Sequence, residues 1–135
     1  MTKLIDECID DEQGIKSLLY NYGLWCRYFG CKGYYSKSSH EESIIDDDSA
    51  LVIDRAMNKL KQENINMYSM LCLFYINGMD ISSIKSNIKT HKNWSKTHFN
   101  EDFVACMKYC TYEIYKSFLE RSESVLAELI KQENK

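Results

Sequence analysis

The absence of proline constrains the fold of this chain more than any other feature of its sequence. The 135 residues include no proline and five glycines, and residues 79–135 contain neither. Because these two residue types interrupt helices most strongly, a chain so poor in them favours helices along its whole length. We therefore predict an all-α fold, a compact helical domain of about five helices that spans residues 1–135 and is long enough to bury a core.

In the N-terminal half, apolar residues recur at helical spacing in two segments. Residues 15–29 predict an amphipathic first helix that ends at Gly30 and Gly33. Asp47 or Ser49 is predicted to cap a second helix with its carboxylate or hydroxyl, and the acids there suit the positive N-terminal end of the helix. Its expected core positions are Val52, Ile53, Ala56, Met57 and Leu60. The acidic residues 1–11 are expected to be frayed.

The middle of the chain predicts two further helices. Residues 67–77 form the third helix, which is expected to stop at Asn77-Gly78. Asp80 is suited to cap a short fourth helix over residues 80–89. The face of that helix expected to be buried consists of Ile81, Ile84 and Ile88.

A polar turn at residues 90–93 is predicted to lead into a long fifth helix. Ser95 or Thr97 would cap this helix, which either runs unbroken to the C-terminal segment or bends near Arg121. Its expected apolar stripe consists of Phe99, Phe103, Met107, Cys110 and Ile114.

Charge is segregated along the chain. Residues 81–100 contain four lysines and two histidines but no aspartate or glutamate, although the whole chain carries a net charge of −3. Such segregation indicates a surface that meets a polyanion, while the acidic remainder keeps the protein in solution.

Residues 67–119 have the helix order of a helix-turn-helix, in which the helix after the turn enters the major groove of DNA. Lysines near the turn would neutralise phosphates, and polar side chains at the start of the last helix would face base edges. The predicted DNA-binding residues are Lys85, Lys89, Lys92, Asn93, Ser95, Lys96, Thr97, His98 and Asn100. The alternative is a solvated lysine face on an ordinary helical bundle.

Aromatic residues crowd positions 20–35 and are interleaved with basic ones. Such a mixture can stack the bases of single strands. However, Tyr22, Trp25 and Phe29 lie on the apolar stripe of the first helix, which favours a place in the core. The residues predicted for a second contact site, with nucleic acid or with a polymerase, are Arg27, Lys32, Tyr35 and Lys37.

Catalysis and metal binding have little support in the sequence. The six cysteines include no CxxC pair and no zinc-finger spacing with histidine, so we expect buried, reduced thiols; a structural metal or a redox pair is the alternative. The histidines lack evident partners, and Asp46, Asp47 and Asp48 fit helix capping better than cation binding. We predict no catalytic residue, no metal and no cofactor. The start of the chain and the lack of a long apolar run predict a cytoplasmic protein without a membrane span.

Three groups of residues together suggest a family. The first is Tyr22-Gly23-Leu24-Trp25-Cys26-Arg27 followed by Gly33-Tyr34-Tyr35-Ser36. The second is the stretch 47–56, with its acidic start and Ile53-Asp54-Arg55-Ala56. The third is Leu71-x-x-x-Tyr75-x-x-Gly78 with Ile84-x-x-x-Ile88. In order and spacing over residues 15–118, they resemble the Gly-x-Trp-x-Arg, Gly-Tyr-x-Ser, Ile-Asp-x-Ala and sigma-region-4-like helix-turn-helix features of the phage antitermination protein Q family of lambdoid prophages.

The resemblance implies a late-gene transcription antiterminator that acts in the cytoplasm of a bacterial host. Such a protein binds double-stranded DNA near a promoter, joins RNA polymerase paused there with sigma, and stays with it so that hairpin terminators cannot form. In this chain, the DNA-reading role falls on residues 92–100, and the region of Trp25 and Arg27 is structural or faces the polymerase. Lys85 departs from the pattern, because the family usually has a small residue there.

Two other functions fit the sequence. An ordinary helix-turn-helix repressor or activator would be a dimer, for which the C-terminal apolar residues could form the seam. A small acidic phage inhibitor, such as a nucleic-acid mimic acting on a CRISPR protein, would not bind DNA. The dimer seam of the repressor or activator would be Val125, Leu126, Leu129 and Ile130. The acidic surface of the inhibitor would be Asp6, Glu7, Asp10, Asp11, Glu12 and the acids of 41–48. The oligomeric state is left open by the sequence.

Overall fold

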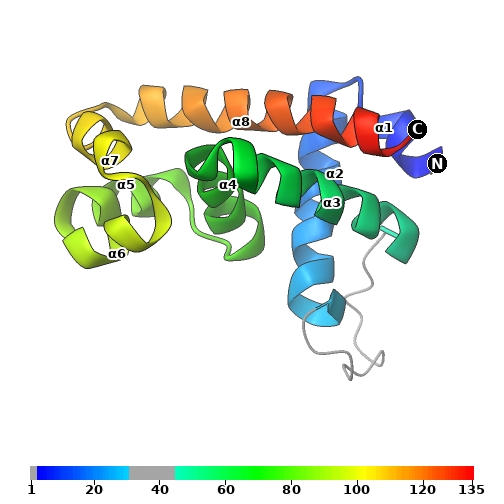
Figure 1. Ribbon diagram of the computed structural model, residues 1–135, viewed down its shortest axis with the longest axis horizontal. Helices are drawn as coiled ribbons and strands as arrows, with labels where there is room; N and C mark the ends of the chain where they lie inside the picture. Colours follow the sequence, from blue (N-terminus) through cyan, green and yellow to red (C-terminus); the bar gives the residue numbers. More distant parts are fainter. Residues whose placement is uncertain (1–2, 31–44) are drawn as a thin grey trace.

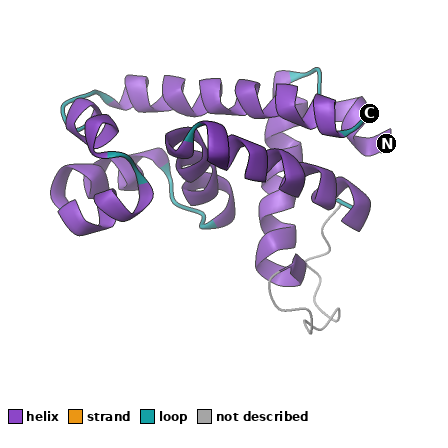
Figure 2. Ribbon diagram, in the orientation of Figure 1, coloured by secondary structure: helices purple, strands orange, loops and turns teal. Residues whose placement is uncertain are grey.

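The computed structural model describes residues 3–30 and 45–135, which form helices and contain no strand (Figures 1 and 2). This confirms the predicted all-α class. The described residues form eight α-helices and two π-helical segments rather than about five helices. In chain order these are α1 (Lys3–Cys8), α2 (Glu12–Trp25), η1 (Cys26–Gly30), α3 (Asp47–Glu63), α4 (Ile65–Leu71), η2 (Cys72–Ile76), α5 (Ile81–Thr90), α6 (Lys92–His98), α7 (Glu101–Met107) and α8 (Tyr112–Glu133).

The long helix α8 organises the molecule. It packs along α3 and α4, and α2 crosses behind them (Figure 1). Helices α5, α6 and α7 gather at one end of α8, whereas α1 and both chain ends lie at the other (Figure 1). The chain therefore has two separated ends that can carry different surfaces.

Helix α3 supplies much of the core. All five residues predicted to be buried on this helix are at most 5% exposed, as are Leu119, Leu126 and Ile130 of α8. The predicted caps, Asp47 and Ser49, were wrong, because Asp46 is the N-cap and its Oδ1 accepts the Ser49 N–H at 3.0 Å. Hydrogen bonds to Ser49 lower the pKa of the Asp46 carboxyl.

The N-terminal segment differs from the frayed stretch predicted for residues 1–11. Residues 3–8 form α1, and Ile5 and Ile9 are buried in the core. Polar contacts hold this segment to the end of α8: the Asn134 amide donates to Asp6 at 3.1 Å, and Lys131 pairs with Asp10 at 3.0 Å. The acids that suggested disorder therefore serve as partners for α8.

Helix α2 and segment η2 approach each other very closely at Gly23. A Cβ atom added to Gly23 would lie 1.9 Å from the backbone oxygen of Tyr75. Segment η2 ends before Gly78, whose φ of 76° lies in the left-handed region that glycine adopts without strain. Gly23 therefore allows α2 to pass close to η2, and Gly78 marks the point where η2 ends.

A buried carboxylate ties α8 to α2 and η2. Glu123 is 2% exposed, and its two oxygens accept hydrogen bonds from Lys16 Nζ at 2.7 Å and from the Tyr75 hydroxyl at 2.5 Å. Burial and the hydrogen bond to Glu123 raise the pKa of the Tyr75 hydroxyl. Because both oxygens have partners, the buried charge is compensated rather than exposed to an apolar core.

The predicted long fifth helix is wrong, because the chain breaks it twice to give α6, α7 and α8. At the first break, Phe99 is extended and buried, with φ −132° and ψ 157°. Side chains of α4 hold this break, since the Ser69 hydroxyl donates to the His98 carbonyl and the Asn100 N–H donates to Asn66 Oδ1 at 2.9 Å. At the second, the Tyr115 hydroxyl donates to the Met107 carbonyl at 2.7 Å.

The cysteines are partly as expected. Of the described cysteines, all five are free, and Cys26 is buried whereas Cys106 is exposed. Burial raises the pKa of the Cys72 thiol. Within residues 3–30 and 45–135, no three His, Cys, Asp or Glu side chains are grouped as a metal site would require. None of the helices described combines the length and apolar composition of a membrane span.

Candidate nucleic-acid interface

Helix α5 forms as its sequence predicts. Asp80 is its N-cap and accepts the Ser83 N–H at 2.8 Å, and Ile81, Ile84 and Ile88 are all buried. The two lysines of this helix are on other faces: Lys85 is half-buried and Lys89 is exposed. Local capping and spacing therefore place the first part of the candidate site.

The predicted turn at residues 90–93 is reduced to one residue. His91 ends α5 and also occupies the N-cap position of α6. Its Nδ1 lies 2.7 Å from the Thr90 hydroxyl. The two helices are therefore joined more tightly than the sequence suggested, and α6 begins at Lys92.

Ser95 was predicted to face DNA, and the structure corrects this assignment. Its side chain is fully buried, and its hydroxyl lies within 3.4 Å of the carbonyl oxygens of Asn87, Ile88 and His91, the shortest distance being 2.9 Å to His91. Ser95 therefore pins α6 to the end of α5. It is neither a helix cap nor a surface residue.

The outward face of α6 carries four of the predicted residues. Lys92, Asn93, Lys96 and Thr97 are all exposed, at the i, i+1, i+4 and i+5 positions of one helical face. The Thr97 hydroxyl donates to the Asn93 backbone carbonyl at 2.9 Å, and the Asn93 side chain is exposed. This face presents two ammonium groups and one amide to solvent.

The two remaining predicted residues lie at the end of α6. The His98 ring is half-buried and packs on Trp94, with ring centroids 4.8 Å apart. Asn100 is exposed, and its backbone N–H is held by Asn66. His98 therefore contributes to packing, whereas the Asn100 side chain remains on the surface beside α7.

Three of the lysines meet a fourth that the sequence did not indicate. Helices α5, α6 and α7 enclose a hollow of about 410 Å³, which we call the lysine hollow. It is lined by Lys89, Lys92, Lys96 and Lys108, by the apolar Ile88 and Val104, and by Glu101. Lys85 does not line it. Lys108 follows the last residue of α7. The sequence prediction did not place it here, because it took residues 95–114 as one continuous helix.

Comparison with known proteins adds no family assignment: no protein-family profile, curated protein or solved structure matches this chain. The roles of the residues therefore depend on the geometry and on the sequence resemblance.

The segments that carry the resemblance contact one another. The Trp25 indole N–H donates to Asp47 at 2.8 Å, and the Tyr22 hydroxyl donates to Asp54. Gly23 lies against the backbone of Tyr75. Residues 22–27 of the first motif are thus joined to the second motif and to Tyr75 of the third, which gives Gly23 and Trp25 structural roles.

The predicted second contact site is only partly described. Arg27 is exposed, and its Nε donates to the Gly23 carbonyl at 3.4 Å. Lys32, Tyr35 and Lys37 lie outside the described residues. Arg27 is therefore the one member of this set that the structure places.

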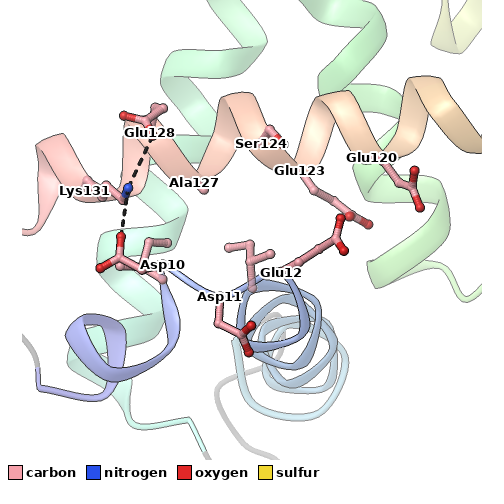
Figure 3. A pocket seen from close by; sticks show the side chains of 11 residues that line it. Asp10, Asp11, Glu12, Glu120, Glu123, Ser124, Ala127, Glu128 and Lys131 are labelled. Atoms are coloured by element: carbon pink, nitrogen blue, oxygen red, sulfur yellow. Dashed lines mark hydrogen bonds and ion pairs between the residues drawn. The ribbon is translucent and has the colours of Figure 1, made fainter.

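An acidic hollow of about 260 Å³ lies between the α1–α2 junction and α8 (Figure 3). Its carboxylates are those of Asp10, Asp11, Glu12, Glu120, Glu123 and Glu128. Lys131 bridges Asp10 and Glu128 across one edge, at 3.0 and 3.3 Å (Figure 3). The acidic hollow and the lysine hollow lie toward opposite ends of the molecule, so the charge segregation of the sequence is also a segregation in space.

Proposed function

We propose that this protein is a DNA-binding transcription antiterminator that engages bacterial RNA polymerase. The observation that carries the DNA-binding part is the lysine surface of α5, α6 and α7, where four lysines gather around one carboxylate. A phosphate backbone is the polyanion that such a surface suits, because binding releases the counterions condensed on DNA. The resemblance to the antitermination protein Q family supports the choice of antitermination among DNA-binding functions.

The outward face of α6 is the part proposed to approach the DNA. Lys92 and Lys96 would contact phosphates, and Asn93 and Asn100 carry amides that can pair with base edges. Ser95 holds the helix to α5 from behind, and the His98 backbone carbonyl accepts a hydrogen bond from Ser69 of α4. This division assigns affinity to the lysines and sequence preference to the amides.

The acidic end of the protein is proposed to face the polymerase. Charge of opposite sign at the two ends would allow one molecule to hold DNA and a protein at once. Several acids there have structural partners as well, including Asp6 with Asn134 and Asp10 with Lys131. An inhibitor that mimics nucleic acid would use the same acids, and it would show no affinity for DNA.

An ordinary dimeric regulator has less support. Leu126, Leu129 and Ile130 are at most 7% exposed, and Val125 is half-buried. The predicted seam is therefore part of the core of the single chain and is not available to a second copy.

We expect Lys92→Ala and Lys96→Ala each to weaken the binding of duplex DNA. Each change removes one phosphate contact, so the slope of log K against log salt should become shallower by roughly one unit. A mobility-shift titration at several salt concentrations measures both effects. Lys3→Ala, on the exposed face of α1 at the far end of the molecule, is the matched control. Unchanged binding in both α6 variants would remove the DNA assignment.

The antitermination role predicts terminator read-through in vitro. Purified RNA polymerase with sigma, paused near a promoter, should pass a downstream hairpin terminator more often when the protein is present. The effect should require the upstream DNA element and should be reduced by Lys92→Ala. Read-through that does not require the upstream DNA element would contradict the proposed dependence of antitermination on DNA binding. No read-through from a protein that binds DNA would leave a DNA-binding regulator without antitermination.

A further inference from the structure

We propose that the lysine hollow is a phosphate-binding site, whose ligand is a phosphate group of a DNA backbone or of a free polyphosphate. This deepens the proposed DNA binding and rests in part on it, because the same four lysines carry both, but the hollow would bind phosphate whether or not the protein acts in transcription.

The charge of the lysine hollow is nearly uncompensated. Among the described residues, Lys89, Lys92 and Lys108 have no ion-pair partner, and Lys96 has only Glu101, at 3.8 Å. The Glu101 side chain is 82% exposed, and an exposed pair at that distance contributes little. The four ammonium groups therefore lack the partner charge that an anion would supply.

The shape of the hollow also suits a compact anion. Two of its lining residues are apolar, the buried Ile88 and the half-buried Val104, and neither carries a charge that would compete for the ammonium groups. The walls belong to three helices whose junctions are fixed by Ser95 and by the buried Phe99. A volume of about 410 Å³ accommodates a chain of phosphates as well as one.

Lys108 distinguishes this site from the outward face of α6. It stands at the C-terminal end of α7, where its backbone N–H is held by the Val104 carbonyl at 2.9 Å. From that position it reaches the hollow opposite α6. A surface that used α6 alone would not need Lys108, so the effect of this residue tests the hollow specifically.

The experiment measures binding of inorganic tripolyphosphate by calorimetry at low salt. Lys108→Ala should weaken binding by about fivefold, the value of one ion pair at about 4 Å in water. Glu101→Gln should tighten it by about two- to fivefold, because it removes the competing carboxylate from Lys96. Lys3→Ala is the control for net charge and should leave the affinity unchanged. Circular dichroism checks that each variant keeps its helices.

Three outcomes would overturn the proposal. They are no binding of tripolyphosphate by the unmodified protein, equal losses in Lys108→Ala and Lys3→Ala, and no change in either Lys108→Ala or Glu101→Gln. The first would show that the hollow does not bind phosphate, the second that net charge rather than the hollow attracts anions, and the third that neither Lys108 nor Glu101 acts on the bound anion.

Duplex DNA, titrated against the same variants, separates the two sources of phosphate. If Lys108→Ala weakens DNA and tripolyphosphate binding alike, the hollow holds a DNA phosphate. If tripolyphosphate binds with the expected pattern and DNA does not bind, the hollow is a site for free polyphosphate, and the proposed DNA function fails alone. If DNA binding depends on Lys92 and tripolyphosphate does not bind, the function stands and the hollow fails.

Discussion

Gly23→Ala is expected to destabilise the protein by about 3 kcal/mol or more, at the upper end of the cost of overpacking a core. The new methyl group would lie 1.9 Å from the Tyr75 oxygen and 2.8 Å from the Tyr75 carbonyl carbon. Both atoms belong to the backbone, so no side-chain rotation can relieve the clash, and α2 must move away from η2. The gain of about 1 kcal/mol from replacing a helical glycine by alanine offsets only part of this cost.

Urea unfolding followed by circular dichroism measures the effect. Ser17→Ala is the matched control, because it lies on the same helix with an exposed side chain and should change stability by at most about 0.5 kcal/mol. An unfolding midpoint for Gly23→Ala equal to or above that of the unmodified protein would show that the two helices are not in tight contact.

Glu123→Ala is expected to cost roughly 3 kcal/mol, the lower end of the range for breaking a buried ion pair. The change leaves the buried Tyr75 hydroxyl without its acceptor and opens a cavity beside α8, where the Glu123 side chain was packed. Lys16 limits the loss, because its side chain is 29% exposed and can turn toward water. Glu123→Gln should cost less, since it keeps the volume and an acceptor for Tyr75.

A double-mutant cycle with Tyr75→Phe identifies the interaction. The double variant should lose less stability than the sum of the two single losses, because each single change removes the same hydrogen bond. Glu120→Ala is the control one turn earlier on α8, at a half-buried carboxylate that lines the same acidic hollow. Additive losses, or a Glu123→Ala protein as stable as Glu120→Ala, would contradict a stabilising role for the buried carboxylate.

The parts of the fold that were predicted from sequence depend on local signals. For α5, the capping residue Asp80 and the spacing of three isoleucines were sufficient, and both were confirmed. For α3, the buried face was correct, but the cap was assigned to Asp47 or Ser49 instead of Asp46. Three consecutive aspartates have the same capping chemistry, and their roles are distinguished by the hydrogen bonds they accept, from the Ser49 N–H at Asp46 and from Trp25 at Asp47.

The breaks around α7 could not be predicted in the same way. They occur in a segment without glycine or proline, and the first is held by Ser69 and Asn66, about thirty residues earlier in the chain. Tertiary contacts therefore override a local pattern that favours one helix. The prediction of the site failed for the same reason. Lys108 joins the other lysines only because α7 ends just before it, and that break was not predicted.

Ser95 shows a second limit of sequence patterns. The segment around Ser95, with its lysines and asparagines, has the composition of a DNA-contacting helix. The Ser95 hydroxyl is nevertheless directed at the backbone of α5. A small hydroxyl residue can serve a tight helix junction or a ligand equally well. Burial decides between these uses, and burial at this position depends on a turn of one residue that the sequence did not reveal.

The contacts of α8 with the N-terminal helices also constrain the order in which the protein can fold. The Asn134–Asp6 and Lys16–Glu123 contacts join residues 128 and 107 positions apart. Because α8 follows every other described element, α1 and α2 leave the ribosome long before their partners exist. Closing such long loops is slow compared with forming the helices themselves. A ribosome-bound chain that lacks α8 should therefore remain sensitive to proteases, and the native state should form only after synthesis has passed Asn134.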